Sequence, residues 1–147
     1  MQMLYEIGLE INGSLDLTQV IEEILNRAIV MVDARIGLLV ISDNERAKIV
    51  GQVGAEDDLS TVLELPEVIN AWKQEKLSQH VVNISSGKHI CIVPLVSRGE
   101  TGGLLVFFDK EKRNNTVGPF EEQDESLLQS FAYQAGASLH NARLYES

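Results

Sequence analysis

Three side chains with metal-binding chemistry fall close together in the second half of this 147-residue chain. Cys91 follows His89 by two residues in a strand-like apolar segment, so both side chains are expected on one face of a strand. Asp109 ends the next apolar segment, which a short turn would pair with the first. Thiolate, imidazole and carboxylate groups are all ligands of transition metals, although a lone cysteine is more often a small buried hydrophobic residue.

A second group of candidates lies in the acidic stretch after Gly54 and in the helix predicted to begin at Pro66. Asp57 and Asp58 place two carboxylates side by side, but such polar runs usually mark a solvated loop and a helix start. Trp72, the only tryptophan, falls on the predicted helix. It is a candidate platform for a ligand, and a residue of this type is more often part of the core.

The rest of the chain excludes several classes of function. GxSxG, HExxH and Walker patterns are missing, so we expect no enzyme activity. Twelve basic residues against 22 acidic residues give a net charge of −10, which would repel nucleic acid and anionic membrane surfaces. The apolar runs are far shorter than the ~20 residues of a membrane helix, so we expect no membrane insertion by this segment. One cysteine fits a reducing compartment, and we expect a cytoplasmic location.

Hydrophobic periodicity predicts the elements that would position these residues. Helices are expected over residues 2–12, 16–32 and 66–76, and from about 121 to the end. Strands are expected over residues 36–42, 47–53, 80–84, 89–97 and 101–109. Asp16 and Gln19 have the spacing of a capping box at the start of the second helix. Short polar turns join successive strands, so the strands must be antiparallel, and the order predicts a single α+β domain over residues 1–147.

The order of the predicted helices and strands, taken together with the residues in them, resembles that of a GAF domain, a regulatory module of many bacterial signalling proteins. The resemblance covers nearly the whole chain and rests on LYEI leading into DLTQVIEEIL, on IVPL followed by a glycine turn and GGLLVFF, and on GPFEEQDESLLQSFAYQAGASLHNARLYE. It implies an antiparallel sheet of about six strands, with the N- and C-terminal helices packed on one face. It also implies a small-molecule pocket on the other face, under the helical segment within residues 54–88. The candidate pocket residues are Asp57, Asp58, Trp72, His89 and Cys91.

Some GAF domains that bind cyclic nucleotides carry Asn-Lys, Phe and Asp-Glu in that order. In this chain Asp109-Lys110, Phe120 and Asp124-Glu125 occupy similar places, with Asp instead of Asn at the first. Lys110 leaving a strand and Asp124 opening a helix would form an ion pair, while Phe120 has the character of a packing residue. We therefore interpret these positions as a scaffold. Acidic residues outnumber basic residues in the pocket segment, which disfavours the anionic phosphate of a cyclic nucleotide.

Cys91 and Asp109 also occupy places similar to the iron ligands of GAF domains that sense nitric oxide. Those sites take further acidic ligands from a loop before the cysteine strand, and here that loop is the neutral SSGK turn. Iron would be short of ligands, so no metal is expected. Covalent bilin attachment in this family commonly uses a Cys followed by His, whereas Cys91 precedes Ile92. The cofactor is left open, and no covalently bound one is expected.

The final predicted helix carries an apolar stripe with further apolar residues beside it, which indicates a partner as well as the sheet. The candidate dimer and signalling residues on the terminal helices are Leu4, Ile7, Leu128, Leu139, Ala142 and Tyr145. Small residues around Gly136 would allow another helix to approach closely. We expect a homodimer that senses a small molecule and passes the signal to an attached output domain, as in a histidine kinase or a transcription regulator. The alternative is a purely structural dimerisation domain with a vestigial pocket.

Overall fold

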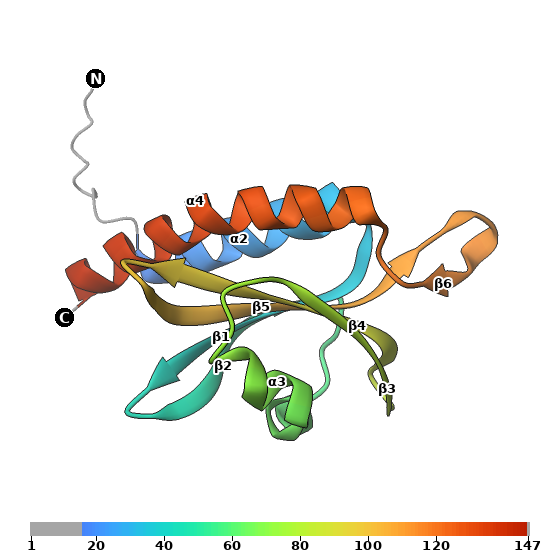
Figure 1. Ribbon diagram of the computed structural model, residues 1–147, viewed down its shortest axis with the longest axis horizontal. Coiled ribbons are helices and arrows are strands. Elements are labelled where there is room, and N and C mark those ends of the chain that lie inside the picture. The colour runs from blue at the N-terminus through green and yellow to red at the C-terminus, as the bar shows by residue number, and fades with distance from the viewer. Residues whose placement is uncertain (1–15, 147) are drawn as a thin grey trace.

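The computed structural model describes residues 16–146 of the chain (Figure 1). Its elements are α2 (Leu17–Val32), β1 (Ala34–Asp43), β2 (Arg46–Val53), the 3-10 helix η1 (Ser60–Glu64), α3 (Pro66–Ala71), β3 (Ser78–Ile84), β4 (Gly87–Ser97), β5 (Glu100–Glu111), the 3-10 helix η2 (Arg113–Asn115), β6 (Val117–Gly118) and α4 (Glu122–Glu146). The helix predicted over residues 2–12, with Leu4 and Ile7, lies outside the described residues. Within residues 16–146, no helix is long and apolar enough to cross a membrane.

The strands form one antiparallel six-stranded sheet in the order β2-β1-β5-β4-β3, and the short β6 pairs with the end of β5. Two tight hairpins turn on residues with left-handed backbone. These are Asn44 (φ 51°) and Glu45 (φ 65°) between β1 and β2, and Arg98 (φ 55°) and Gly99 (φ 77°) between β4 and β5. Two-residue turns of this kind match the right-handed twist of paired strands. The predicted α+β architecture is confirmed.

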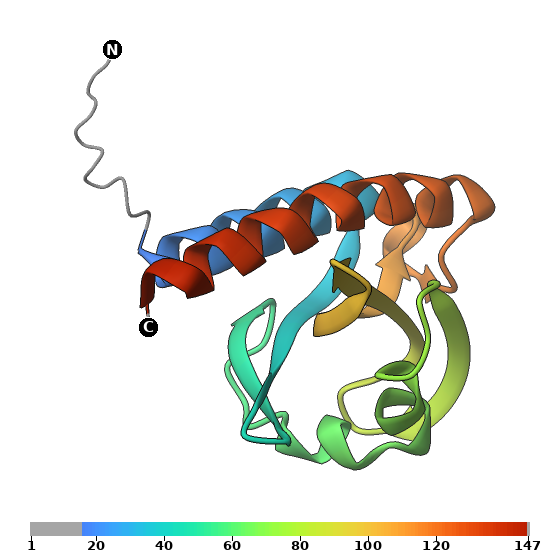
Figure 2. The ribbon, with the colours of Figure 1, turned by 60° about the vertical axis from the view of Figure 1, so that its left-hand side comes forward.

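Helices cover both faces of the sheet (Figures 1 and 2). On one face, α2 and α4 lie antiparallel to each other and bury a cluster of apolar residues that we call the helix-side core. On the other face, η1 and α3 bury a second cluster, the α3-side core. Alternate residues of each strand serve the two cores, so that Leu105 faces α2 and α4 while Leu104 faces α3. The predicted placement of the terminal helix on one face and a helical segment on the other is confirmed.

Two details of the helices differ from the sequence predictions. Asp16 makes no side-chain hydrogen bond at the start of α2, and its backbone carbonyl accepts from Gln19 N at 2.9 Å instead. The predicted capping box is therefore wrong. The α3 helix ends at Ala71 rather than at residue 76. Trp72 still packs on the α3-side core, but the four residues after it, 73–76, are polar and exposed and have no apolar face to pack on the sheet.

The long helix α4 lies close to the sheet at Gly136. A Cβ atom at this position would come within 2.9 Å of the carbonyl oxygen of Val96 in β4. Gly136 therefore faces the sheet, and the close approach that the small residues around it predict is made to β4 rather than to another helix. Further along α4, Arg143 places Nη1 and Nη2 each 3.3 Å from a strand carbonyl oxygen, that of Gly102 and that of Ser42 respectively. These contacts fix α4 against the sheet.

Candidate functional site

A buried ion pair joins the end of β5 to the first turn of α4. Lys110 Nζ lies 2.8 Å from Oδ2 and 3.0 Å from Oδ1 of Asp124, and it also donates to the carbonyl oxygen of Val32 at 3.1 Å. Asp124 Oδ2 in turn accepts from the backbone N–H of Glu121 at 2.8 Å, which caps the helix. The side chains of Lys110 and Asp124 are 13% and 8% exposed. The ion pair predicted between these two residues is confirmed, and its contacts are those of a scaffold.

Asp109 is a second buried carboxylate, and it holds the turn between β3 and β4. Its Oδ1 accepts the backbone N–H groups of Lys88 at 3.2 Å and His89 at 2.9 Å. Its Oδ2 lies 3.7 Å from Nη2 of Arg35, which also donates to the carbonyl oxygen of Ser86 at 2.9 Å. Arg35 is the second residue of β1 and belongs to no recognisable motif, so the sequence did not indicate this contact. These contacts occupy the Asp109 carboxylate and give it a structural role.

Phe120 is 4% exposed and packs edge-on against Phe107, with ring centroids 6.4 Å apart. The predicted packing role is confirmed. The backbone of Phe120 is held by the side chain of Gln79 in β3, whose Oε1 accepts from Phe120 N at 2.9 Å and whose Nε2 donates to Phe120 O at 3.0 Å. The same Nε2 donates to Glu125 Oε2 at 2.5 Å. Gln79 was missed because it precedes the strand that the sequence predicts.

The acidic pair after β2 has local partners. Asp57 and Asp58 are both exposed, and Asp58 Oδ1 accepts from the backbone N–H of Ser60 at the start of η1, at 2.9 Å. Hydrogen bonds from Ser60 lower the pKa of Asp58. The carbonyl oxygen of Asp57 accepts from Nε2 of Gln52 at 3.0 Å. These contacts fit the interpretation of the pair as a loop and helix start.

The five candidate pocket residues do not come together. Trp72 is half-buried against the α3-side core, whereas Cys91 is fully buried in the helix-side core. His89 lies two residues before Cys91 in β4, so its side chain points to the same face of the sheet, and it is half-buried. The assignment of Cys91 to a pocket under α3 is therefore wrong. In a strand buried on both faces every position is apolar, so the sequence does not say which alternate residues face which layer.

The surroundings of Cys91 suppress its chemistry. Burial raises the pKa of the Cys91 thiol strongly, and the carboxylates of Glu125 and Asp124 raise it further. The thiolate is the form that binds metals and attacks electrophiles, so this residue behaves as a small apolar side chain. Within residues 16–146, no group of three or more His, Cys, Asp and Glu side chains could hold a metal ion.

Apolar side chains occupy the face where a GAF pocket is expected. Leu59, Val62, Val68 and Ala71 of the covering segment are 0–3% exposed and belong to the α3-side core, where they meet strand residues such as Phe108. A molecule that binds between this segment and the sheet must therefore displace it.

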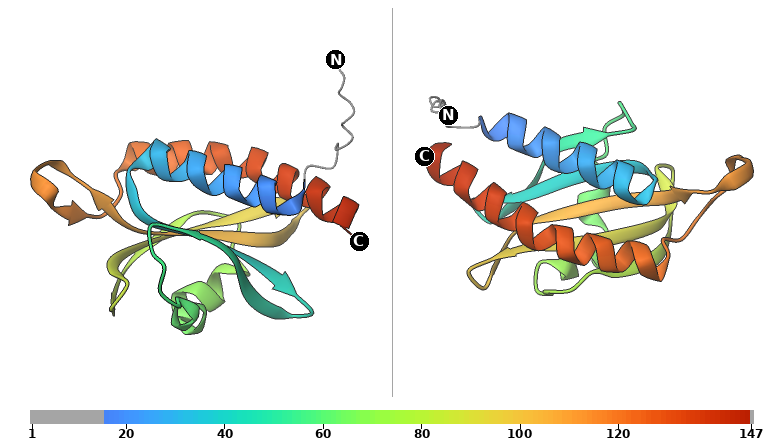
Figure 3. Two further views of the ribbon diagram at one scale, coloured as in Figure 1. Left: turned by 180° about the vertical axis from the view of Figure 1, so that it is seen from behind. Right: turned by 90° about the horizontal axis from the view of Figure 1, so that it is seen from above.

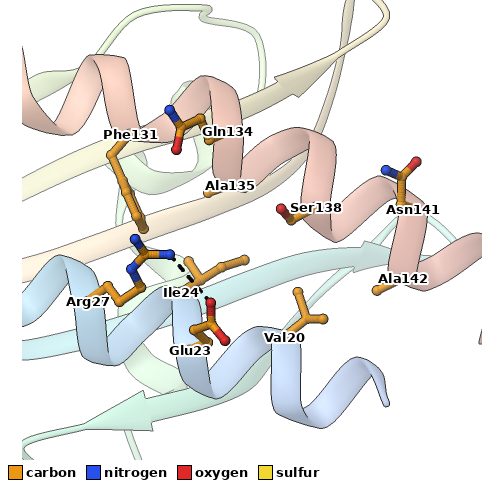
Figure 4. A pocket seen from close by; sticks show the side chains of 10 residues that line it. All are labelled: Val20, Glu23, Ile24, Arg27, Phe131, Gln134, Ala135, Ser138, Asn141 and Ala142. Carbon is orange, nitrogen blue, oxygen red and sulfur yellow. Dashed lines mark hydrogen bonds and ion pairs between the residues drawn. The ribbon is translucent and has the colours of Figure 1, made fainter. Parts of the chain in front are cut away.

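A groove runs between α2 and α4 on the outer surface of the helical layer, with a volume of about 280 Å³ (Figure 4). Its lining residues are Val20, Glu23, Ile24, Arg27, Phe131, Gln134, Ala135, Ser138, Asn141 and Ala142. Of the candidate dimer residues, Leu128 and Leu139 are 0% and 2% exposed and pack inside the domain, so they are not available to a partner. Ala142 lines the groove but is also buried in the helix-side core, at 6% exposure. The side chain of Tyr145 lies outside the described residues.

The family model for the GAF domain matches residues 16–139. The chain belongs to the GAF domain family. GAF domains are small-molecule-binding regulatory modules of signalling proteins, and this one has the sheet and the two helical coverings described above.

Solved structures of low sequence identity share this GAF fold. The GAF domain/HD domain protein from Geobacter sulfurreducens is 14% identical, with a TM-score of 0.70, over 90% of this chain and 97% of that one. The second GAF domain of DevS from Mycobacterium smegmatis is 18% identical, with a TM-score of 0.70, over 89% and 98%. The type II free methionine-R-sulfoxide reductase from Thermoplasma acidophilum is 16% identical, with a TM-score of 0.64, over 86% and 96%. The fold thus occurs both in signalling proteins and in an enzyme.

Proposed function

We propose that this GAF domain is a non-catalytic, cytoplasmic regulatory module that dimerises through α2 and α4. In this proposal it relays the state of a small-molecule site on the α3 side to an attached output domain. The observation that carries the proposal is the antiparallel helix pair, in which the start of α2 and the end of α4 lie at the same end of the molecule (Figure 3). A change in the packing of the pair would reach both connections at once.

The outer surface of the helix pair supports a second copy of this chain as the partner. Phe131 lines the groove between polar side chains and is half-buried, so part of its ring is open to a partner. Val30 on α2 and Leu127 on α4 are 75% and 40% exposed. Two such helix pairs facing each other would bury these residues in a four-helix bundle with twofold symmetry, the commonest symmetry of soluble oligomers.

Replacing Phe131 with glutamate is expected to weaken the dimer at least about tenfold, because a carboxylate would be buried without a partner in the interface. Sedimentation equilibrium over a range of protein concentrations measures the dissociation constant. Val81→Glu is the matched control, since Val81 is 66% exposed on β3 and does not line the groove. A wild-type monomer at every concentration, or equal weakening by both variants, would contradict this interface.

A molecule bound under α3 is expected to change the fluorescence of Trp72, because this half-buried side chain packs against the core that the molecule must displace. Trp72 is the only tryptophan, so the signal has one source. Native mass spectrometry of freshly purified protein identifies retained small molecules, and a metabolite screen then follows the emission. Protein that retains nothing, and whose emission no metabolite alters, would argue against small-molecule sensing.

The second candidate function is a purely structural dimerisation domain, and the filled α3-side core favours it. The two candidates differ in one outcome, since a structural domain forms the dimer but binds no metabolite. The reductase activity named for the Thermoplasma acidophilum structure is disfavoured in this chain, because Cys91 is the only cysteine and it is buried with a raised pKa. An iron site at Cys91 and Asp109 is disfavoured as well, because Asp109 accepts two backbone hydrogen bonds and Cys91 faces α2 and α4.

A further inference from the structure

Two glutamines tie the start of β3 to the first turns of α4. Gln79 reaches from β3 and makes two hydrogen bonds to the backbone of Phe120, plus one to the side chain of Glu125. Gln129 reaches the other way from α4, and its Oε1 accepts from the backbone N–H of Leu77 at 3.0 Å. The contacts therefore run in both directions between residues 77–79 and residues 120–129.

The positions of these contacts connect the two helical layers. Leu77 follows α3 after the short stretch 72–76, and β3 is an edge strand of the sheet. The α3 helix lies on one face of the sheet and α4 on the other (Figure 2), so the chain leaving α3 passes round the sheet edge to reach Gln79. Its first hydrogen bonds to α4 are those of the two glutamines.

The geometry of the contacts makes them sensitive to small movements. The side-chain amide of Gln79 pairs with both the N–H and the C=O of Phe120, as a neighbouring strand would. Bonds of 2.5 to 3.0 Å are lost when the partners separate by about an ångström. Phe120 is also fixed to the helix-side core through its ring, so its backbone position bears directly on where α4 begins.

We propose that Gln79 and Gln129 are positioning residues that couple the α3 segment to the N-terminal turns of α4. Displacement of α3 moves residues 77–79, and the glutamine hydrogen bonds carry this movement to α4. The inference rests on the proposed function, because it supplies the route by which an occupant under α3 acts on the helix pair. The coupling can be tested without a ligand or a dimer, because a substitution in α3 disturbs the helix in place of a bound molecule.

Val68→Ala provides the disturbance, because Val68 is a fully buried residue of α3 and the loss of its methyl groups loosens the packing of that helix. Hydrogen exchange of the backbone amides of residues 125–129 provides the readout. In a chain with both glutamines, Val68→Ala is expected to speed this exchange about fivefold, the effect of weakening one hydrogen bond. In the Gln79→Met/Gln129→Met background, which keeps side-chain size and removes the amides, the same substitution is expected to change the exchange less than about twofold.

Gln123→Met is the matched control, since Gln123 is exposed on the same turns of α4, and the fivefold response should survive it. Amides of residues 104–108 in β5 report global unfolding and should respond less than those of α4. A response that persists without the glutamines, or one that is equal in β5, overturns the proposal. If the double variant does not fold, the single variant Gln129→Met is used as the background instead. In that background the acceleration of exchange by Val68→Ala is expected to be partly lost. If the metabolite screen fails, the exchange experiment still tests the coupling between α3 and α4. If the exchange experiment fails, the proposals of a dimer and of a small-molecule site are not affected.

Discussion

Replacing Asp124 with alanine is expected to lower the free energy of unfolding by about 3–5 kcal/mol, because the largely buried ammonium group of Lys110 would lose its main partner. Lys110 is only 13% exposed, and its remaining hydrogen bond in the described contacts goes to the carbonyl oxygen of Val32. The substitution also removes the cap that Asp124 provides for Glu121 N. Urea denaturation followed by circular dichroism measures the loss.

Glu121→Ala is the matched control, since it removes an exposed ion pair near the same helix start. Glu121 Oε2 lies 4.0 Å from Lys112 Nζ, and the two side chains are 61% and 35% exposed. Solvent screens such a pair, so its removal should cost less than about 1 kcal/mol. The double variant Lys110→Met/Asp124→Leu should recover part of the stability, because no charge is then left buried without a partner. Equal losses for Asp124→Ala and Glu121→Ala would show that the buried pair contributes nothing special.

The sequence predicted the features of this domain that follow from periodicity and from neighbouring residues. The strands around both hairpins were placed within a few residues, because apolar runs are bounded there by polar turns that tolerate left-handed backbone. The Lys110–Asp124 pair was predictable because one residue leaves a strand and the other opens a helix. β6 was missed, since its residues, 117–118, are too few to show a period.

The sequence could not predict which layer a strand residue faces or which distant residues meet. Cys91 was placed in the wrong layer, because a register change of one residue exchanges the faces of a uniformly apolar strand. Gln79 and Gln129 are polar residues without a motif, and their roles appear only when β3 and α4 are side by side. The small residues around Gly136 likewise indicated a close approach, but not that the neighbour is the backbone of β4.

Replacing Gly136 with alanine is expected to destabilise the domain by about 1–3 kcal/mol, although alanine is the better helix former by about 1 kcal/mol. The new Cβ would lie 2.9 Å from the carbonyl oxygen of Val96, closer than real Cβ contacts, and backbone cannot rotate away as a flexible side chain can. Either α4 or β4 must shift, which opens the packing around Leu139 and Leu95 in the helix-side core. Chemical denaturation at one fixed protein concentration measures the change.

Ser130→Ala is the matched control for helix propensity, because Ser130 is exposed on the same helix and alanine there should raise the stability by a few tenths of a kcal/mol. The sign of the effect decides between the two roles considered for Gly136. If the glycine instead served a partner helix, Gly136→Ala would weaken the dimer in sedimentation while raising the unfolding free energy of the isolated subunit, as Ser130→Ala does. Loss of subunit stability is the result expected if Gly136 is the point where α4 rests on the backbone of β4.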